Sequence, residues 1–321
     1  PDDPNKTEPG DCGCGVAVTD TDGDMIPDCI DPCPNWPYEC SEDGDTLTVP
    51  ADATVGSIQA AITAIPTGGT IQLEAGTYTP AVTIDAAGKV FTLRGATDVD
   101  GTPTSILDGQ DSIRLLECTN GEGNDTVFQN LLIANGTATN GGGMYCLTSS
   151  PTLINCTFQA NTAADKGAGL LNDQASSPIV TGCRFIENIG VYGGGMGNYN
   201  GSSPEVTDCS FTRNATSRGA GMFNAFDCNP VVTNCQFIEN TGTSRGGAVR
   251  NVWGGTQTFS NCLFQSNSSD DIGGGMFNGN DAHAIIESCQ FIENTSVNGG
   301  GAIADYVGVV SIQNSLLCGN L

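Results

Sequence analysis

The sequence contains few basic residues and almost no histidine. Lysine and arginine total 10 against 36 acidic residues, which gives a formal charge of −26. A surface this acidic repels nucleic acid and anionic membranes and attracts cations. The single histidine, His283, has no adjacent Gly-His-Gly string or paired aspartates, and we interpret it as a surface or corner residue.

Long apolar stretches are also missing. No run of about 18 apolar residues occurs, so we expect no membrane-spanning helix. The chain begins at Pro1 without a recognisable leader, and we expect that a leader has been removed or left out. Its 44 glycines follow no Gly-X-Y period, which excludes collagen. An apolar share of 38 % is sufficient for a packed core.

A repeat runs through most of the chain. The string Cys-x-Phe-x-x-Asn occurs six times, in steps of 26 or 27 residues. A second string with the same step places glycines or alanines before an apolar residue, as at Met196 and Met222. Self-similarity at a fixed period is the signature of a repeat architecture. The repeated positions are Cys156, Cys183, Cys209, Cys235, Cys262 and Cys289 with Phe158, Phe185, Phe211, Phe237, Phe264 and Phe291.

The repeat unit predicts strands. Each unit holds two or three short runs with period-2 alternation, separated by Gly, Asn, Ser and Pro. Helical periodicity is absent from the units, which excludes α-solenoids. Stacking in register would pair each strand with its copy one coil away, about 4.8 Å along the axis. We therefore expect a parallel β-helix with ladders of phenylalanine, methionine and cysteine inside, the repeated cysteines being free buried thiols.

Residues 46–135 contain looser rungs of the same kind. The segment 57–65, SIQAAITAI, is the one amphipathic helix candidate, and strand-like sequence follows it. A β-helix must cover the open end of its core, so we expect this helix to form an N-terminal cap. The predicted fold is all-β, with a β-helix over 46–321 whose regular rungs occupy 136–321.

Two stretches resemble known families. The paired motifs of FIENTSVNGGGAI, residues 291–303, are similar to the repeats of chlamydial polymorphic outer-membrane proteins. The segment 49–79, VPADATVGSIQAAITAIPTGGTIQLEAGTYT, resembles the start of pectate-lyase-like β-helix proteins. These resemblances imply a right-handed parallel β-helix. They do not imply an activity, because this fold carries enzymes, adhesins and structural shafts alike.

Closely spaced carboxylates occupy residues 20–31, DTDGDMIPDCID. Their spacing matches positions 1, 3, 5, 9 and 12 of a calcium loop, with a backbone carbonyl at position 7. Met25 replaces the usual glycine at position 6 and no helices flank the segment, so it departs from an EF-hand. We predict a Ca²⁺ site here, an acidic linker being the alternative. The predicted ligands are Asp20, Asp22, Asp24, Ile26, Asp28 and Asp31.

Five cysteines crowd around this loop, namely Cys12, Cys14, Cys29, Cys33 and Cys40. Together with the acidic loop they resemble thrombospondin type 3 repeats, which are disulfide-bonded segments wrapped around calcium. The resemblance implies a calcium-binding, disulfide-stabilised head over residues 1–45. We expect two disulfides there, with one cysteine left over. Because disulfides persist in oxidising compartments, we expect an extracellular or cell-surface location.

Two further cysteines, Cys118 and Cys146, lie 28 residues apart and outside the repeated string. They are the best candidates for a disulfide in the shaft. The in-register cysteines are poorer candidates, because stacking aims their side chains in parallel.

No catalytic constellation is evident, so we predict no catalytic residue. Asp270 and Asp271 form an adjacent acidic pair, but they lie in a polar loop. A basic row at Lys166, Arg218 and Arg245 precedes the glycine corners, and we interpret it as solvated.

Aromatic residues that could stack on sugars are expected to be exposed but scattered. They are Tyr192, Tyr199, Trp253 and Phe277.

These features favour a non-enzymatic extracellular protein that assembles head to tail into a calcium-stabilised filament or surface layer. The last rung, VVSIQNSLLCGNL (309–321), shows no capping helix, and an uncovered end recruits another chain. A surface adhesin is the alternative, and a polysaccharide lyase or epimerase is a third possibility. The expected partner is this chain itself or an extracellular glycan, without nucleic acid or membrane insertion.

Overall fold

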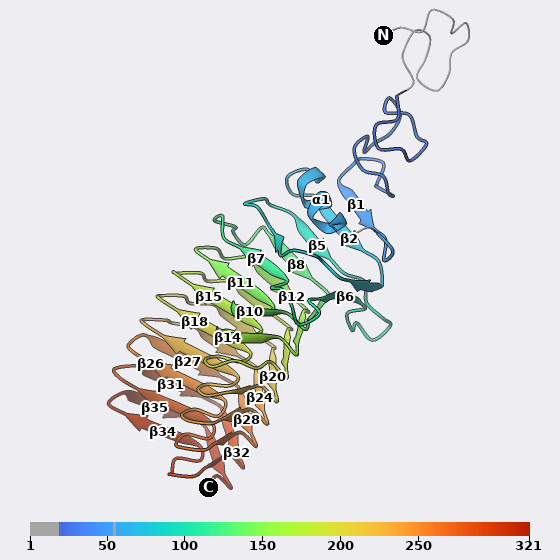
Figure 1. The fold of residues 1–321 in the computed structure, drawn as a ribbon. Coiled ribbons are helices and arrows are strands. Elements are labelled where there is room, and N and C mark those ends of the chain that lie inside the picture. The colour runs from blue at the N-terminus through green and yellow to red at the C-terminus, as the bar shows by residue number, and fades with distance from the viewer. Residues whose placement is uncertain (1–18, 54–55) are drawn as a thin grey trace, which may run out of the picture.

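The computed structural model describes residues 19–53 and 56–321, and it shows a right-handed parallel β-helix behind a short irregular head (Figure 1). Every pairing between named strands in the described residues is parallel. Successive strands along the chain belong to three long sheets in turn. The predicted all-β solenoid is therefore confirmed. We call the long sheets sheets 1, 2 and 3, in the order in which they follow one another along one turn, and their strands are counted over the described residues.

Sheet 1 has eleven strands. They are β1 (Thr46–Val49), β2 (Thr70–Leu73), β5 (Thr92–Arg94), β8 (Val127–Gln129), β12 (Thr152–Ile154), β16 (Ile179–Thr181), β19 (Glu205–Thr207), β23 (Val231–Thr233), β27 (Thr256–Ser260), β31 (His283–Glu287) and β35 (Val309–Gln313).

Sheet 2 has ten strands. They are β3 (Gly76–Tyr78), β6 (Ser105–Asp108), β9 (Leu131–Ala134), β13 (Thr157–Gln159), β17 (Arg184–Ile186), β20 (Ser210–Thr212), β24 (Gln236–Ile238), β28 (Leu263–Gln265), β32 (Gln290–Ile292) and β36 (Leu316–Cys318).

Sheet 3 has nine strands, and it carries the site described below. They are β4 (Ile84–Asp85), β7 (Leu116–Cys118), β11 (Met144–Leu147), β15 (Leu170–Asp173), β18 (Met196–Tyr199), β22 (Met222–Ala225), β26 (Val249–Val252), β30 (Met276–Gly279) and β34 (Ile303–Tyr306). Two short ladders lie between sheets 2 and 3 along the chain. They are β10 (Thr137–Asn140) with β14 (Thr162–Lys166), and β21 (Ala215–Thr216) with β25 (Thr241–Gly242), β29 (Ser268–Ser269) and β33 (Thr295–Ser296).

The interior consists of the predicted ladders. The six repeated phenylalanines stack face to face from Phe158 to Phe291, with ring centroids 4.4–5.0 Å apart and rings within 5° of parallel. The six repeated cysteines are buried free thiols, as expected. The thiols also form hydrogen bonds between neighbouring turns. For example, the Cys156 backbone N–H donates to the Cys183 sulfur at 3.3 Å.

The asparagines of the repeat form a hydrogen-bonded ladder inside the same core. The side-chain amide of Asn188 donates to Oδ1 of Asn214 at 3.0 Å and to the carbonyl of Phe158 at 2.9 Å. Both asparagines are fully buried. A buried amide is tolerated only when its hydrogen bonds are made, and the next turn supplies the missing partner.

The predicted capping helix is also present as α1 (Ser57–Ala64). Ile58, Ala61 and Ile62 are buried and join the same apolar cluster as the interior of the shaft. The helix lies beside β1 and β2 near the N-terminal end of the solenoid (Figure 1).

The predicted Cys118–Cys146 disulfide is wrong. The two residues are direct register partners on β7 and β11, and both are buried free thiols. They therefore form a short ladder of their own in sheet 3. Parallel strands in register aim equivalent side chains in the same direction, which does not suit the near-perpendicular torsion of a disulfide.

Candidate active site on the outer face of sheet 3

Alternate residues of sheet 3 point away from the core. Residues such as Leu116 and Met144 join the interior cluster, so their neighbours along each strand face outward. Register brings these outward residues into one row across the turns. From the N-terminal end, the row is Asp85, Glu117, Tyr145, Leu171, Gly197, Phe223, Arg250, Phe277 and Ala304.

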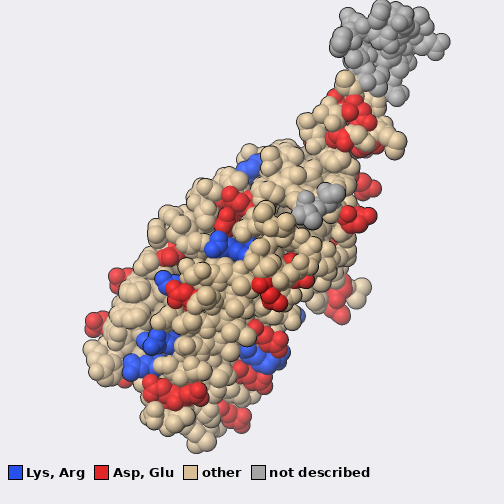
Figure 2. All heavy atoms as spheres, viewed as in Figure 1, with Lys and Arg blue, Asp and Glu red and all other residues tan. Residues whose placement is uncertain are grey.

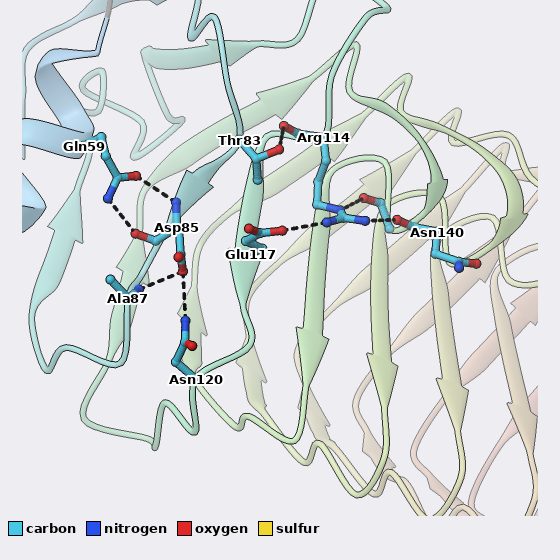
Figure 3. Close-up of polar contacts among 9 residues, drawn as sticks. Gln59, Thr83, Asp85, Ala87, Arg114, Glu117, Asn120 and Asn140 are labelled. Atoms are coloured by element: carbon cyan, nitrogen blue, oxygen red, sulfur yellow. Dashed lines mark hydrogen bonds and ion pairs between the residues drawn. The ribbon is translucent and has the colours of Figure 1, made fainter.

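The row begins with two carboxylates on neighbouring strands. Asp85 on β4 pairs in register with Glu117 on β7, and Figure 3 shows the two side chains on the same face. Arg114 holds Glu117 through a hydrogen bond of 2.6 Å between Nη1 and Oε2. The same guanidinium donates to the backbone carbonyls of Asn140 at 3.0 Å and Gly141 at 3.2 Å. Arg114 is thereby fixed to the next turn, and it orients Glu117.

Asp85 has a different set of partners. Its Oδ1 accepts from the Ala87 backbone N–H at 2.8 Å and from the Asn120 amide at 3.4 Å. Gln59 of α1 hydrogen-bonds both the N–H and the carbonyl of Asp85, at 2.9 and 3.0 Å (Figure 3). The capping helix therefore positions this strand. No lysine or arginine pairs with Asp85 within the described residues.

Beyond these carboxylates the face becomes basic and aromatic. Its buried apolar residues form a second cluster, separate from the interior core. Figure 2 shows groups of Lys and Arg atoms along the flank on which β7 to β26 lie. We define the basic–aromatic strip as Tyr145, Lys166, Leu171, Tyr192, Tyr199, Arg218, Phe223, Phe226, Arg245, Arg250, Trp253 and Phe277.

Cation–π contacts hold the strip together. Lys166 lies 4.6 Å from the ring centroid of Tyr199, and Arg245 lies 5.3 Å from that of Phe277. Arg218 lies 5.3 Å from the Tyr192 ring, and its Nη1 donates to the Tyr192 hydroxyl at 2.7 Å. Such contacts are favourable within about 6 Å of the ring centroid.

Arg250 lies between Phe223 and Phe277, its register partners in the strip. Its guanidinium is 5.6 Å from the Phe223 ring and 5.4 Å from the Phe277 ring, and the residue is only 6 % exposed. Burial, together with the charges of Arg218 and Arg245, lowers the pKa of Arg250 to about 10. Its Nε and Nη1 have no hydrogen-bond partner among the described residues.

The structure corrects two expectations from the sequence. Tyr199 and Phe277 are buried rather than exposed, at 3 % and 0 %. The four aromatic residues are also not scattered, since Tyr192, Tyr199, Trp253 and Phe277 all belong to the strip. The basic row at Lys166, Arg218 and Arg245 is half-buried against these rings rather than solvated.

The other polar candidates lie outside the outward row of sheet 3, although Asp271 contacts Arg245 of the strip. His283 starts β31 in sheet 1, where its Nε2 lies 3.4 Å from the Ser311 hydroxyl. Asp271 forms an ion pair with Arg245 at 3.3 Å, and Asp270 is exposed.

Sequence reasoning missed Asp85, Arg114, Glu117 and Arg250. Asp85 and Glu117 are 32 residues apart, in the looser rungs where the repeat gives no register. Arg250 could have been found, because it follows the repeated apolar position of the second string. Alternation along a strand then places it outside, next to Phe223 and Phe277.

The head brings together part of the predicted calcium ligand set. Carboxylate oxygens of Asp20, Asp22 and Asp24 lie within 4.8 Å of one another. Asp28 is not part of this cluster. Its carboxylate instead accepts hydrogen bonds from the side chains of Thr19 and Thr21, and these bonds lower the pKa of Asp28.

The two remaining predicted ligands are Ile26 and Asp31. Ile26 is exposed, and its N–H donates to Asp24 at 2.7 Å. Asp31 accepts from the Cys33 backbone N–H at 2.8 Å, while its Oδ2 is buried without a partner among the described residues.

Cysteine pairing in the head agrees in part with the sequence. Cys33 and Cys40 form a disulfide, and Cys29 is disulfide-bonded as well. Cys12 and Cys14 lie outside the described residues.

Comparison with solved structures finds enzymes with the same fold. An alginate lyase of family PL6, AlyGC, is 14 % identical with a TM-score of 0.52, over 85 % of this chain and 39 % of that one. Pectate lyase Pel9A is 16 % identical with a TM-score of 0.49, over 84 % of this chain and 78 % of that one. The catalytic unit of an α-1,3-glucanase from Streptomyces thermodiastaticus is 13 % identical with a TM-score of 0.22, over 81 % and 66 %.

The structural comparison contradicts the expectation of a non-enzymatic protein. The neighbour with a TM-score above 0.5 is an alginate lyase, which is an enzyme rather than a filament subunit or an adhesin. Identities this low establish a shared fold, and the activity of this chain has to be argued from its own residues.

Sequence comparison gives the family. No curated protein matches the chain. A family model described as a right-handed β-helix region matches residues 93–264, which is more than half of the chain. The chain therefore belongs to the right-handed β-helix family.

Proposed function

We propose that this chain is a polysaccharide-degrading enzyme that binds a glycan along the basic–aromatic strip and cleaves it beside Asp85 and Glu117. The observation that carries the proposal is the carboxylate pair on neighbouring strands, held on the same face as the strip. The names of the alginate lyase and the pectate lyase reported above indicate enzymes that act on polysaccharides, which agrees with this reaction class.

Two carboxyl groups supply the chemistry that glycosidic cleavage requires. One gives its proton to the departing glycosidic oxygen. The other removes a proton, from water in hydrolysis or from a sugar carbon in elimination. Arg114 would keep Glu117 oriented, while the Asp85 side chain has only the neutral donors Ala87 and Asn120 among the described residues. Two carboxyl groups in unlike environments are suited to unlike roles.

Aromatic and cationic side chains supply binding. Trp253 and Phe226 stack with ring centroids 4.7 Å apart and are 40 % and 44 % exposed. Exposed rings of this kind offer apolar faces to sugars, with a polar surrounding for the hydroxyl groups. The strip crosses successive turns, so a bound glycan would run along the axis of the shaft.

Activity can be tested on alginate, polygalacturonate and α-1,3-glucan by release of reducing ends. Ultraviolet absorbance of an unsaturated product would separate elimination from hydrolysis. We expect Asp85→Asn and Glu117→Gln each to lower kcat by about 10²–10⁴-fold, the usual contribution of a general acid or base.

Matched controls are Asp208→Asn and Glu205→Gln, which change exposed carboxylates near sheet 1 and should retain activity. Cleavage that survives both Asp85→Asn and Glu117→Gln would refute the assignment. An inactive chain on all three polymers would count against the proposed function itself.

We also propose that the head binds Ca²⁺ through Asp20, Asp22 and Asp24. Their clustered oxygens are the donors that calcium prefers, and Asp22 has a buried Oδ2 without a partner among the described residues. Asp24 also lines a hollow whose other acidic residues are Asp31, Glu39, Glu42 and Glu74.

We propose an extracellular location, because the Cys33–Cys40 disulfide suits an oxidising compartment. An extracellular glycan is then the partner. No helix in the described part of the chain is long and apolar enough to cross a membrane. Self-association stays a prediction that no described contact tests.

A further inference from the structure

Three arginines gather at one place on an otherwise acidic protein. Arg250 on β26 lies close enough to Arg218 and Arg245 for their charges to disfavour its own. Like charges repel, so the arrangement is costly unless an anion compensates it.

The protein itself compensates only part of this charge. Among the described residues, Arg245 has one carboxylate partner, Asp271, at 3.3 Å, and Arg218 has only the neutral hydroxyl and ring of Tyr192. Arg250 has no carboxylate within ion-pair distance among the described residues. Two cations are thus left without a counter-charge.

Arg250 is also left without hydrogen bonds at Nε and Nη1, although it is 6 % exposed. A buried polar group without a partner is rare in folded proteins, and a buried charge without one is rarer. Phe223 and Phe277 lie beside the guanidinium and offer ring faces, but no acceptor atoms.

A second unpartnered group lies beside the same ring. The Tyr199 hydroxyl is buried without a hydrogen-bond partner among the described residues, and the Tyr199 ring lies 5.4 Å from that of Phe223. Tyr199 also contacts the exposed Phe226, 6.4 Å away, which stacks on Trp253. Unpaired donors therefore adjoin a surface suited to a sugar ring.

We propose that Arg218, Arg245 and Arg250 form a subsite for the carboxylate or sulfate group of an acidic polysaccharide. The inference rests on the proposed function and names its substrate class. An anion bound here would accept the free guanidinium donors and neutralise the clustered charge, while Phe226 and Trp253 contact the sugar. A neutral glycan would leave Arg250 unpaired.

The subsite is distant from the carboxylate pair. Five strand spacings separate Arg250 from Glu117, about 24 Å along the axis. Only a glycan of several sugar units could reach both places. Loss of the subsite should therefore raise KM on long chains with little change in kcat.

Calorimetric titration of the full chain with oligomannuronate tests the inference, with cello-oligosaccharide of equal length as the neutral probe. Inorganic sulfate and acetate serve as free anions. We expect the acidic oligomer to bind at least tenfold more tightly than the neutral one. Arg250→Met and Arg218→Gln should each weaken binding of the acidic oligomer about tenfold or more.

Arg213→Gln is the matched control, since Arg213 is exposed and pairs with Glu187 at 3.0 Å near sheet 2. Melting curves establish that each variant is folded, and the half-buried Arg218 provides a second variant if Arg250→Met does not fold. Equal binding by Arg250→Met, or equal weakening by Arg213→Gln, would overturn the subsite. Free sulfate or acetate binding as tightly as the oligomer would overturn the polysaccharide as its ligand.

The proposed function and this inference fail in different ways. An inactive chain that still binds the acidic oligomer through Arg250 would support the subsite and refute the enzymatic function. A chain that cleaves a neutral glycan, with no effect of Arg250→Met, would support the enzymatic function and refute the subsite.

Discussion

At the scale of single residues, stability and function separate by the direction in which a side chain points. On β20, the Phe211 side chain enters the interior ladder, whereas Thr212 faces outward and is partly exposed. Phe211 stacks between Phe185 and Phe237 at 4.7 Å on both sides. The same alternation places Arg250 outside the interior core, among the rings on the outer face of sheet 3.

Phe211→Ala should destabilise the shaft by about 3–5 kcal/mol, because it leaves a cavity in a close-packed interior and removes two ring contacts. Thr212→Ala changes the neighbouring outward residue and should cost less than about 1 kcal/mol. Chemical denaturation followed by circular dichroism measures both. Similar losses for the two variants would contradict the inward stacking of Phe211.

At the scale of elements, the capping helix is tied to both the core and the carboxylate pair. Gln59 of α1 holds the backbone of Asp85 from one side. At the other end of the helix, the Lys89 ammonium donates to the carbonyls of Ile62, Thr63 and Ile65 at 2.6–2.9 Å. A cation at a helix C-terminus satisfies unpaired carbonyls and interacts favourably with the helix dipole.

Lys89→Met should therefore loosen α1, with a loss of about 1–2 kcal/mol in local stability. Hydrogen exchange of the α1 amides is the measurement, and faster exchange confined to the helix and β4 is expected. Arg94→Met provides the control, since Arg94 is exposed and contacts only Gln72 in the described structure. Unchanged exchange in Lys89→Met would show that the three carbonyl contacts contribute nothing to the cap.

Lys89→Met should also shift the position of Asp85, because Gln59 of α1 hydrogen-bonds the backbone of Asp85 on β4. The carboxylate pair therefore depends on α1 as well as on β4 and β7, the two strands that carry it. The loose rungs at residues 46–135 are where this connection forms, and the regular repeats have no counterpart of it.

At the scale of the whole molecule, the head and the shaft are stabilised in part by different means. The shaft has a continuous apolar core, which Cys33 and Trp36 of the head join. The head from residue 19 to 45 also has a disulfide and clustered carboxylates. Neighbouring carboxylates repel unless a cation lies between them.

Removal of calcium with EDTA should loosen the head and leave the shaft folded. Limited proteolysis would detect cleavage within residues 19–45, and a melting curve would show an unchanged main transition. Added Ca²⁺ should restore protection, whereas Asp20→Asn combined with Asp22→Asn should abolish this response. A shaft that unfolds with EDTA would contradict the division between the two parts.

The sequence by itself determined the solenoid. The spacing of Cys183 and Phe185 recurs in register, and alternation decides which side chains enter the core. The capping helix at 57–65 was also predictable, because apolar periodicity and the need to close the core are local and general. These features can be read from residue order alone, since equivalent side chains pack against each other in successive turns.

Only the tertiary structure decided the candidate site. Asp85 and Glu117 come from turns of unequal length, so no period aligns them before strands pair. The direction of Cys118 and Cys146 excludes a disulfide that their spacing seemed to allow. Among the described residues, Nε and Nη1 of Arg250 have no partner, because its neighbours across the sheet are rings and its nearby charges are cations. This arrangement depends on contacts among three different turns. Sequence order sets which residues repeat, whereas stacking of the turns sets which non-repeating residues meet.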